Sequence, residues 1–224
     1  MELYDIQQSV SVEGVRYSND GTVTLNLSDK RQLKLAPEIW VDLGHPLNKP
    51  LTETQLQLLE QESCYTQVRN KVLGFLAMRE HSASELRRKL KQRFSKSGTI
   101  NSSSLIERCL LELQTKGLQS DERFARQFVE SKLKNKPQGP FKILSQLLDR
   151  GISREMANLV LNEFGNQELW LNKSIECLEK IQKKGKNHTL AALSQKLYQQ
   201  GFSWGTIEKA LKEYQDMKSI SDTV

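Results

Sequence analysis

The chain of 224 residues has little of what membrane-spanning, secreted or disulfide-stabilised proteins need. It has no run of about 18 apolar residues, so no membrane-spanning helix is expected. The segment Met1–Ile6 has neither the basic start nor the apolar stretch of a signal peptide. The three cysteines, Cys64, Cys109 and Cys177, are far apart and without CxxC spacing, as is typical of free thiols in a reducing compartment. We therefore expect a cytoplasmic protein.

Motifs of catalysis and cofactor binding are also missing. The sequence has no GxxxxGK[ST], GxGxxG or GxSxG, and its three histidines lie far apart without other ligand types at metal-binding spacing. Glu80-His81-Ser82 could suggest a catalytic site, but Ser82 followed by Glu85 is more typical of a helix N-cap. The sequence therefore predicts no enzyme activity, no cofactor and no metal.

Basic charge is concentrated in the middle third of the chain. The net charge is −5 for residues 1–66, +10 for residues 67–150 and +1 for residues 151–224. A local excess of this size favours an anionic partner by about two to one over a merely solvated surface. The sequence thus indicates either a phosphate-bearing or an acidic protein partner.

The first 40 residues have the alternation of β-strands. Residues 10–17, 22–27 and 32–35 alternate between apolar and polar types, and Ser18-Asn19-Asp20-Gly21 between the first two has turn composition. These segments predict an antiparallel meander of two or three strands. Because so small a sheet is marginal alone, we expect it to pack on the following helices.

From residue 52 onward the apolar spacing is helical. Thr52 with Gln55 and Ser82 with Glu85 have the form of capping boxes at two helix starts. Gly117 is placed to end a helix in the left-handed conformation, and Pro140 is placed in a first helical turn.

An internal repeat of 50 residues is visible in the second half. Leu147-Leu148-x-x-Gly151-Ile152-Ser153 matches Leu197-Tyr198-x-x-Gly201-Phe202-Ser203, and residues 86–113 match more loosely, with an insertion around residues 95–100. Each unit has a helix, a glycine corner and a second helix, preceded by a further helix. The sequence therefore predicts a mainly α fold, in which tandem three-helix repeats form an elongated curved array behind the small β-meander. The expected divisions are 1–50, 51–117, 118–165 and 166–224.

Three ordered motifs resemble the RecX family. The first is Leu76-Ala77-Met78-Arg79-Glu80-His81-Ser82-x-x-Glu85-Leu86-x-x-Lys89-Leu90, the second runs from Leu113 through Gly117 to Ala125, and the third from Gly139-Pro140 to Gly151-Ile152. The resemblance extends more weakly to about Tyr214. The inserted residues Ser95–Thr99 lengthen a corner that is usually tight in the family, so binding geometry at that corner is expected to differ if it meets a partner.

What this resemblance implies is a regulator that binds RecA and the RecA–single-stranded DNA filament, and polar faces at the ends of the repeats allow it to be a monomer. It would negatively modulate ATPase, recombinase and coprotease activity in recombination, DNA repair and the SOS response, with basic residues facing acidic RecA surfaces or the DNA phosphate backbone. The residues we select as partner-binding are Arg79, Arg87, Arg88, Lys91, Arg123, Arg126 and Lys132.

Two other functions stay open from the residues alone. One is a nonspecific DNA-binding helical repeat protein without a RecA partner, with affinity that falls steeply with salt. The other is a scaffold that binds acidic proteins and has negligible DNA affinity. Base-stacking platforms are not expected in the basic middle region, because its aromatic residues are few and Phe124, Phe128 and Phe141 have the spacing of core residues.

Overall fold

The computed structural model describes residues 9–94, 102–183 and 188–221. The chain divides into two compact units, the first made of residues 1–79 and 86–118 and the second of residues 80–85 and 119–224. The corner insertion at residues 95–99 lies outside the described residues.

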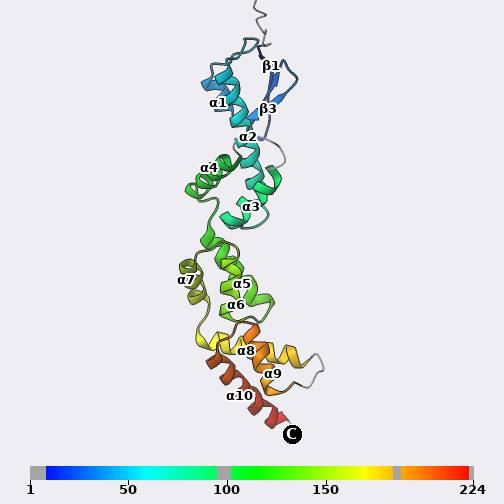
Figure 1. Cartoon of the computed structure of the whole chain (residues 1–224), viewed down its shortest axis with the longest axis vertical. Coiled ribbons are helices and arrows are strands. Elements are labelled where there is room, and N and C mark those ends of the chain that lie inside the picture. Colours follow the sequence, from blue (N-terminus) through cyan, green and yellow to red (C-terminus); the bar gives the residue numbers. More distant parts are fainter. Residues whose placement is uncertain (1–8, 95–101, 184–187, 222–224) are drawn as a thin grey trace, which may run out of the picture. The chain divides into compact units, whose positions relative to one another are not determined.

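The first unit begins with a three-stranded antiparallel sheet in the order β1-β2-β3 (Figure 1). The strands are β1 (Val12–Tyr17), β2 (Val23–Leu27) and β3 (Gln32–Leu35), so the predicted meander is confirmed. Its alternate residues, with Val23 and Leu25 fully buried, pack against Trp40 and Leu59. These two residues come from α1 (Pro37–Asp42) and α2 (Glu53–Leu76), so the sheet gains the helical support it needs.

The same long helix, α2, also forms the first three-helix repeat with α3 (Ala83–Phe94) and α4 (Ser102–Thr115). It begins at the predicted capping box, in which Thr52 accepts a hydrogen bond from the Gln55 backbone and Gln55 accepts one in return. Val68 and Val72 of α2 pack with Leu86 of α3 in one apolar core. Since each helix has one apolar face, the three close around that core.

The second unit contains two further three-helix repeats (Figure 1). The second repeat is α5 (Asp121–Asn135), α6 (Pro140–Leu148) and α7 (Arg154–Phe164), and the third is α8 (Gln167–Gln182), α9 (Leu190–Gln199) and α10 (Trp204–Ser221). Each has its own apolar core. The mainly α fold with tandem three-helix repeats is therefore confirmed, whereas the domain divisions at residues 50, 117 and 165 stay a prediction. Among the described residues, no helix is both long and apolar enough to cross a membrane.

The glycine corners of the repeat have the predicted left-handed backbone. Gly151 has φ 78° and Gly201 has φ 87°, and in both corners the residue after the glycine is buried and donates its backbone N–H five residues back. This is the hydrogen-bond pattern of a glycine-terminated helix. The corners hold the last turn of α6 and of α9 at a fixed angle to the helix that follows.

Each corner also docks on the N-terminus of a helix from the preceding repeat. Gly139 and Phe141, at the start of α6, donate backbone hydrogen bonds of 2.8 Å and 3.1 Å to the carbonyl oxygens of Gln200 and Gly201. A Cβ atom on Gly201 would lie 2.3 Å from the Lys142 backbone nitrogen, so only glycine fits.

The corresponding docking in the second repeat uses serine side chains. Ser82, just before α3, donates its hydroxyl to the Arg150 carbonyl oxygen at 2.7 Å, and a Cβ atom on Gly151 would lie 2.4 Å from Ser84 Cβ. Both docking contacts thus depend on the left-handed glycine of the sequence motif, with backbone hydrogen bonds at Gly201 and a serine hydroxyl at Gly151.

One predicted core residue is wrong. Phe141 is 59% exposed, because the start of α6 is turned toward the Gly201 corner and its second residue projects outward. Phe124 is buried and Phe128 is half-buried, as expected, and their rings stack 6.0 Å apart.

Candidate interaction surface

Among the selected basic residues, Arg87, Arg123 and Arg126 form ion pairs with described residues, and the first of them lies on α3. The Arg87 guanidinium donates a bidentate pair of hydrogen bonds to the Glu107 carboxylate, with Nε–Oε1 at 2.6 Å and Nη2–Oε2 at 2.7 Å. This hydrogen bond to Arg87 holds the pKa of Glu107 below its ordinary value. An anionic partner would have to compete with this carboxylate.

The other two paired arginines lie on α5. Arg123 Nε lies 2.8 Å from Glu80 Oε1, and Arg126 contacts both Glu122 at 2.9 Å and Glu163 at 3.0 Å. The hydrogen bond from Arg126 lowers the pKa of Glu163, which is the expected effect of a neighbouring guanidinium. The charges of these arginines are therefore partly offset before any partner arrives.

The remaining selected residues of the first unit are exposed. Arg88 lies on the outer face of α3, and no carboxylate among the described residues pairs with it. Lys91, also exposed, contributes to lowering the pKa of Glu107, and Arg79 is exposed shortly after the end of α2. Arg88 is thus the selected residue of α3 that is most accessible to a new anion.

The seventh selected residue, Lys132 of α5, lies in a group of like charges. Its ammonium nitrogen is 5.0 Å from the centre of the Phe128 ring, and the Arg150 guanidinium lies 4.6 Å from the same centre. Partial burial lowers the pKa of Lys132, and the charges of Arg150, Lys136 and Lys142 lower it further. The structure brings these four cations together, and we call them the second-repeat cation cluster.

Carboxylates are scarce around this cluster. Lys142 Nζ is held by the Gln200 side chain at 3.0 Å and the Gln199 carbonyl at 3.4 Å, both of them neutral acceptors. In the part of the chain that the structure describes, Glu85 is the one carboxylate paired with the cluster, at 3.5 Å from Arg150 Nε. Glu85 is itself shared with the buried His81 at 3.0 Å.

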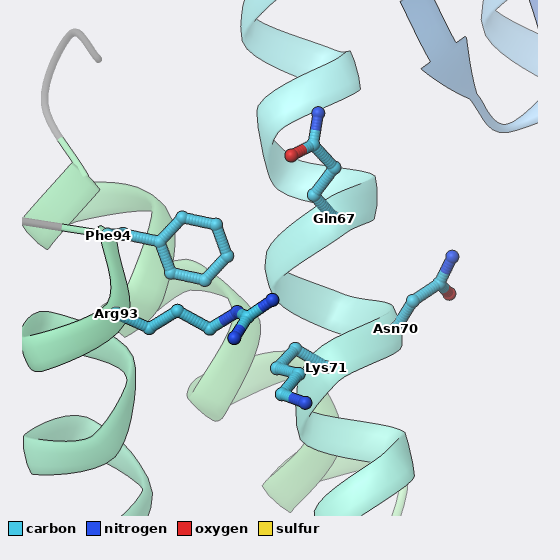
Figure 2. Close-up of a pocket in the computed structure, with 5 residues that line it drawn as sticks. All are labelled: Gln67, Asn70, Lys71, Arg93 and Phe94. Atoms are coloured by element: carbon cyan, nitrogen blue, oxygen red, sulfur yellow. The ribbon is translucent and has the colours of Figure 1, made fainter. Parts of the chain in front are cut away.

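A second basic site lies in the first unit, where a groove of about 580 Å³ runs between α2 and the end of α3. Figure 2 shows the Arg93 side chain reaching from α3 toward α2, where Lys71 projects. Gln67 and Asn70 of α2 and Phe94 of α3 complete the lining. Cationic and amide groups without a carboxylate among the lining residues suit an anion.

The two basic sites share a cation–ring–cation arrangement. In the first unit, Lys71 and Lys89 lie 5.0 Å and 4.7 Å from the Phe75 ring centre, much as Lys132 and Arg150 flank Phe128. Rings of this kind attract cations through their negative faces, so they hold two like charges together.

Sequence reasoning missed part of both sites. The predicted partner-binding residues did not include Arg150, Lys136 or Lys142. A usable signal was present: Lys71 and Phe75, like Phe128 and Lys132, are four residues apart and so share a helix face.

The architecture defines the class of protein, a three-helix-repeat protein with basic, carboxylate-poor surfaces. A family profile described as "RecX, second three-helix domain" matches residues 120–161, which span α5 to α7. The regulatory protein RecX of Prosthecochloris aestuarii is 32% identical over 144 residues, covering 64% of this chain and 91% of the relative. The regulatory protein RecX of Lactococcus lactis subsp. cremoris is 25% identical over 194 residues, covering 84% of this chain and 70% of the relative. The chain therefore belongs to the RecX family of regulatory proteins.

Solved structures agree on the fold. A crystal structure of regulatory protein RecX superposes with a TM-score of 0.71 at 18% identity and covers 90% of this chain and 98% of its own. The crystal structure of RecX from Lactobacillus salivarius gives a TM-score of 0.58 at 20% identity, covering 68% of this chain and 97% of its own. The resemblance inferred from the three motifs is confirmed.

Proposed function

We propose that this chain binds RecA and RecA–single-stranded DNA filaments and negatively modulates their ATPase, recombinase and coprotease activities. Membership of a family of regulatory proteins supports a regulatory role without catalysis. The observation that carries the proposal is the second-repeat cation cluster, in which Lys132 and Arg150 flank the Phe128 ring and Lys136 and Lys142 lie near Lys132, with a single paired carboxylate among the described residues. We also propose that the protein is a monomer and acts in the cytoplasm.

The cations of the cluster repel one another. The pKa of Lys132 is lowered by burial and by three neighbouring cations, so these charges repel one another in the free protein. An anionic group placed among them relieves that repulsion and gains charge-assisted hydrogen bonds. Binding and protonation are linked, so the pKa of Lys132 should rise when the partner is bound.

The groove of the first unit supplies a second basic contact for the same kind of partner. Arg88 and Lys91 lie on the same helix as Arg93 and remain our proposed contacts there, together with Arg79. We assign a smaller part to the three paired arginines, Arg87, Arg123 and Arg126, because their charges are already offset by glutamates.

The test is direct binding to preformed filaments of RecA from the same organism. The full chain, labelled with a fluorophore, is titrated with RecA–single-stranded DNA filaments, and anisotropy gives the affinity. Lys136→Glu should weaken binding about tenfold, because it places a carboxylate within the cluster. Lys134→Glu is the matched control, since Lys134 lies in the last turn of α5, two residues before Lys136, and pairs with Glu130. Equal loss in both variants, or no binding by the natural chain, contradicts the proposal.

The alternative is nonspecific binding to DNA alone, which the basic groove between α2 and α3 favours. Free single-stranded and duplex DNA are added as competitors in the same titration. If RecA binding is the function, free DNA at the concentration present in the filament leaves most of the complex intact. Complete displacement by free DNA favours the alternative.

A further inference from the structure

Three exposed aromatic side chains gather at the Gly201 corner of the third repeat. Tyr198, in the last turn of α9, is 56% exposed, and Trp204, at the start of α10, is 58% exposed. Phe141, 59% exposed, is brought to the same corner by its backbone hydrogen bond to Gly201. Aromatic side chains are usually buried to a large extent, so such a group calls for a functional explanation.

Two of the three rings are already stacked. The centroids of Tyr198 and Trp204 lie 5.3 Å apart with an interplanar angle of 23°, so the rings are nearly parallel. Their exposure leaves room for another flat ring to extend the stack. The corner that carries them is rigid, because Gly201 is fixed by its left-handed backbone and by its close approach to α6.

Two lysines lie near the Gly201 corner. Lys142 Nζ contacts only Gln199 and Gln200 in the described part of the chain, and Lys196, in the last turn of α9, has its Nζ 2.7 Å from the His188 ring. Among the described residues, these contacts include no carboxylate. Both ammonium groups can therefore interact with phosphate.

A groove of about 540 Å³ adjoins Phe141. Its apolar walls include Pro140 and Trp170, and its polar lining offers both donors and acceptors from Ser203, Thr206, Gln167, Glu168 and Lys209. Flat apolar faces next to mixed hydrogen-bonding groups suit a nucleobase. A uniformly acidic partner would be opposed by Glu168.

We propose that the Gly201 corner is a stacking site for unpaired bases of single-stranded nucleic acid, with Tyr198 and Trp204 as the platform and Lys142 and Lys196 as phosphate contacts. Stacking of bases on aromatic side chains tolerates any sequence and requires bases that are not paired in a duplex. The expected ligand is therefore a single strand, bound without sequence preference. The site shares Lys142 with the second-repeat cation cluster, whereas its stacking platform, Tyr198 and Trp204, lies outside that cluster and can be tested in the absence of RecA.

The experiment titrates the full chain with a twenty-nucleotide oligothymidylate and with a twenty-base-pair duplex. Trp40 is buried and Trp170 nearly so, which makes Trp204 the exposed tryptophan whose fluorescence a stacked base would quench. We expect quenching and binding by the oligothymidylate, with at least tenfold weaker binding of the duplex.

Two variants identify the residues. Tyr198→Leu and Trp204→Arg place at this corner the side chains that the second repeat carries at Leu148 and Arg154, so the fold has a precedent for them. Each should weaken oligothymidylate binding about tenfold, as expected for the loss of one stacking partner. Trp204→Arg adds a positive charge, so a fall in affinity cannot come from lost electrostatic attraction. Trp204→Phe should abolish the fluorescence change but keep most of the affinity.

The proposal is overturned if both variants bind oligothymidylate as tightly as the natural chain. It is also overturned if duplex binding falls by the same factor, because a duplex offers no unpaired base. A loss confined to binding of RecA filaments would assign the aromatic corner to a protein contact. Since the oligothymidylate titration contains no RecA, its failure leaves the proposed function untouched.

Discussion

The second and third repeats build the same corner from the same backbone, yet present different surfaces. Both corners end a helix with a glycine in the left-handed conformation, bury the next residue and dock on the preceding repeat. Around Gly151 the exposed and half-exposed side chains include two cations, Arg150 and Arg154. Around Gly201 the corresponding positions hold Gln200 and Trp204.

This difference separates what the repeat needs for folding from what it can vary. The glycine and the buried residue after it are restricted by positive φ and by close backbone contact, so the motif retains them. The side chains on the outside of the corner are not restricted in this way. One repeat can therefore carry charges for an anionic partner while its neighbour carries aromatic rings.

The largest expected effect comes from breaking the corner itself. Gly201→Ala combines a positive φ with a Cβ atom 2.3 Å from the Lys142 backbone, so we expect a loss of about 3 kcal/mol or more in the free energy of unfolding. Gly117→Ala also has positive φ but open space around it, and should cost about 1 kcal/mol. Denaturant unfolding measures both, and equal losses would refute the docking role of Gly201.

The next largest effect is expected when the aromatic pair of the third repeat is copied onto the second repeat. Leu148→Tyr together with Arg154→Trp copies the aromatic pair onto the second repeat. If corner side chains alone determine the ligand, this variant should bind oligothymidylate about fivefold more tightly than the natural chain. Fluorescence titration measures the gain. Unchanged affinity would show that Phe141 and its groove are also required.

A smaller effect is expected within the second-repeat cation cluster. Arg150→Met removes one of the positive charges that depress the pKa of Lys132, so that pKa should rise toward its ordinary value while the effect of burial remains. Titration of the lysine side-chain signals by NMR detects the change. A pKa that stays the same would mean that Arg150 and Lys132 are not close neighbours in solution. Lys134→Met, remote from the ring, is the control.

The smallest effect concerns the Arg87–Glu107 pair. The pKa of Glu107 lies below its ordinary value of 4.5, so the pair stabilises the fold above pH 4.5 and this contribution is lost as pH falls through the folded pKa. Because the pair is largely exposed, its contribution is about 0.5 kcal/mol. The difference in melting temperature between the natural chain and Arg87→Met should therefore shrink below pH 4. A difference that grows at low pH contradicts this sign.

Local rules in the sequence predicted much of the fold. The capping box at Thr52, the strand alternation around Leu25 and the glycine corners follow from short-range preferences that the tertiary structure leaves in place. The interaction surface was harder to predict. Arg123 pairs with Glu80, which lies 43 residues away in the sequence, and the exposure of Phe141 depends on how α6 meets the Gly201 corner.

The most direct test of the central claim is the ATPase activity of RecA on single-stranded DNA, with this protein added below the RecA concentration. The account predicts a dose-dependent fall in ATP hydrolysis with the natural chain and with Lys134→Glu, and a fall at least fivefold weaker with Lys136→Glu. Unchanged hydrolysis with the natural chain, or equal inhibition by both variants, would contradict regulation of RecA through the second-repeat cation cluster.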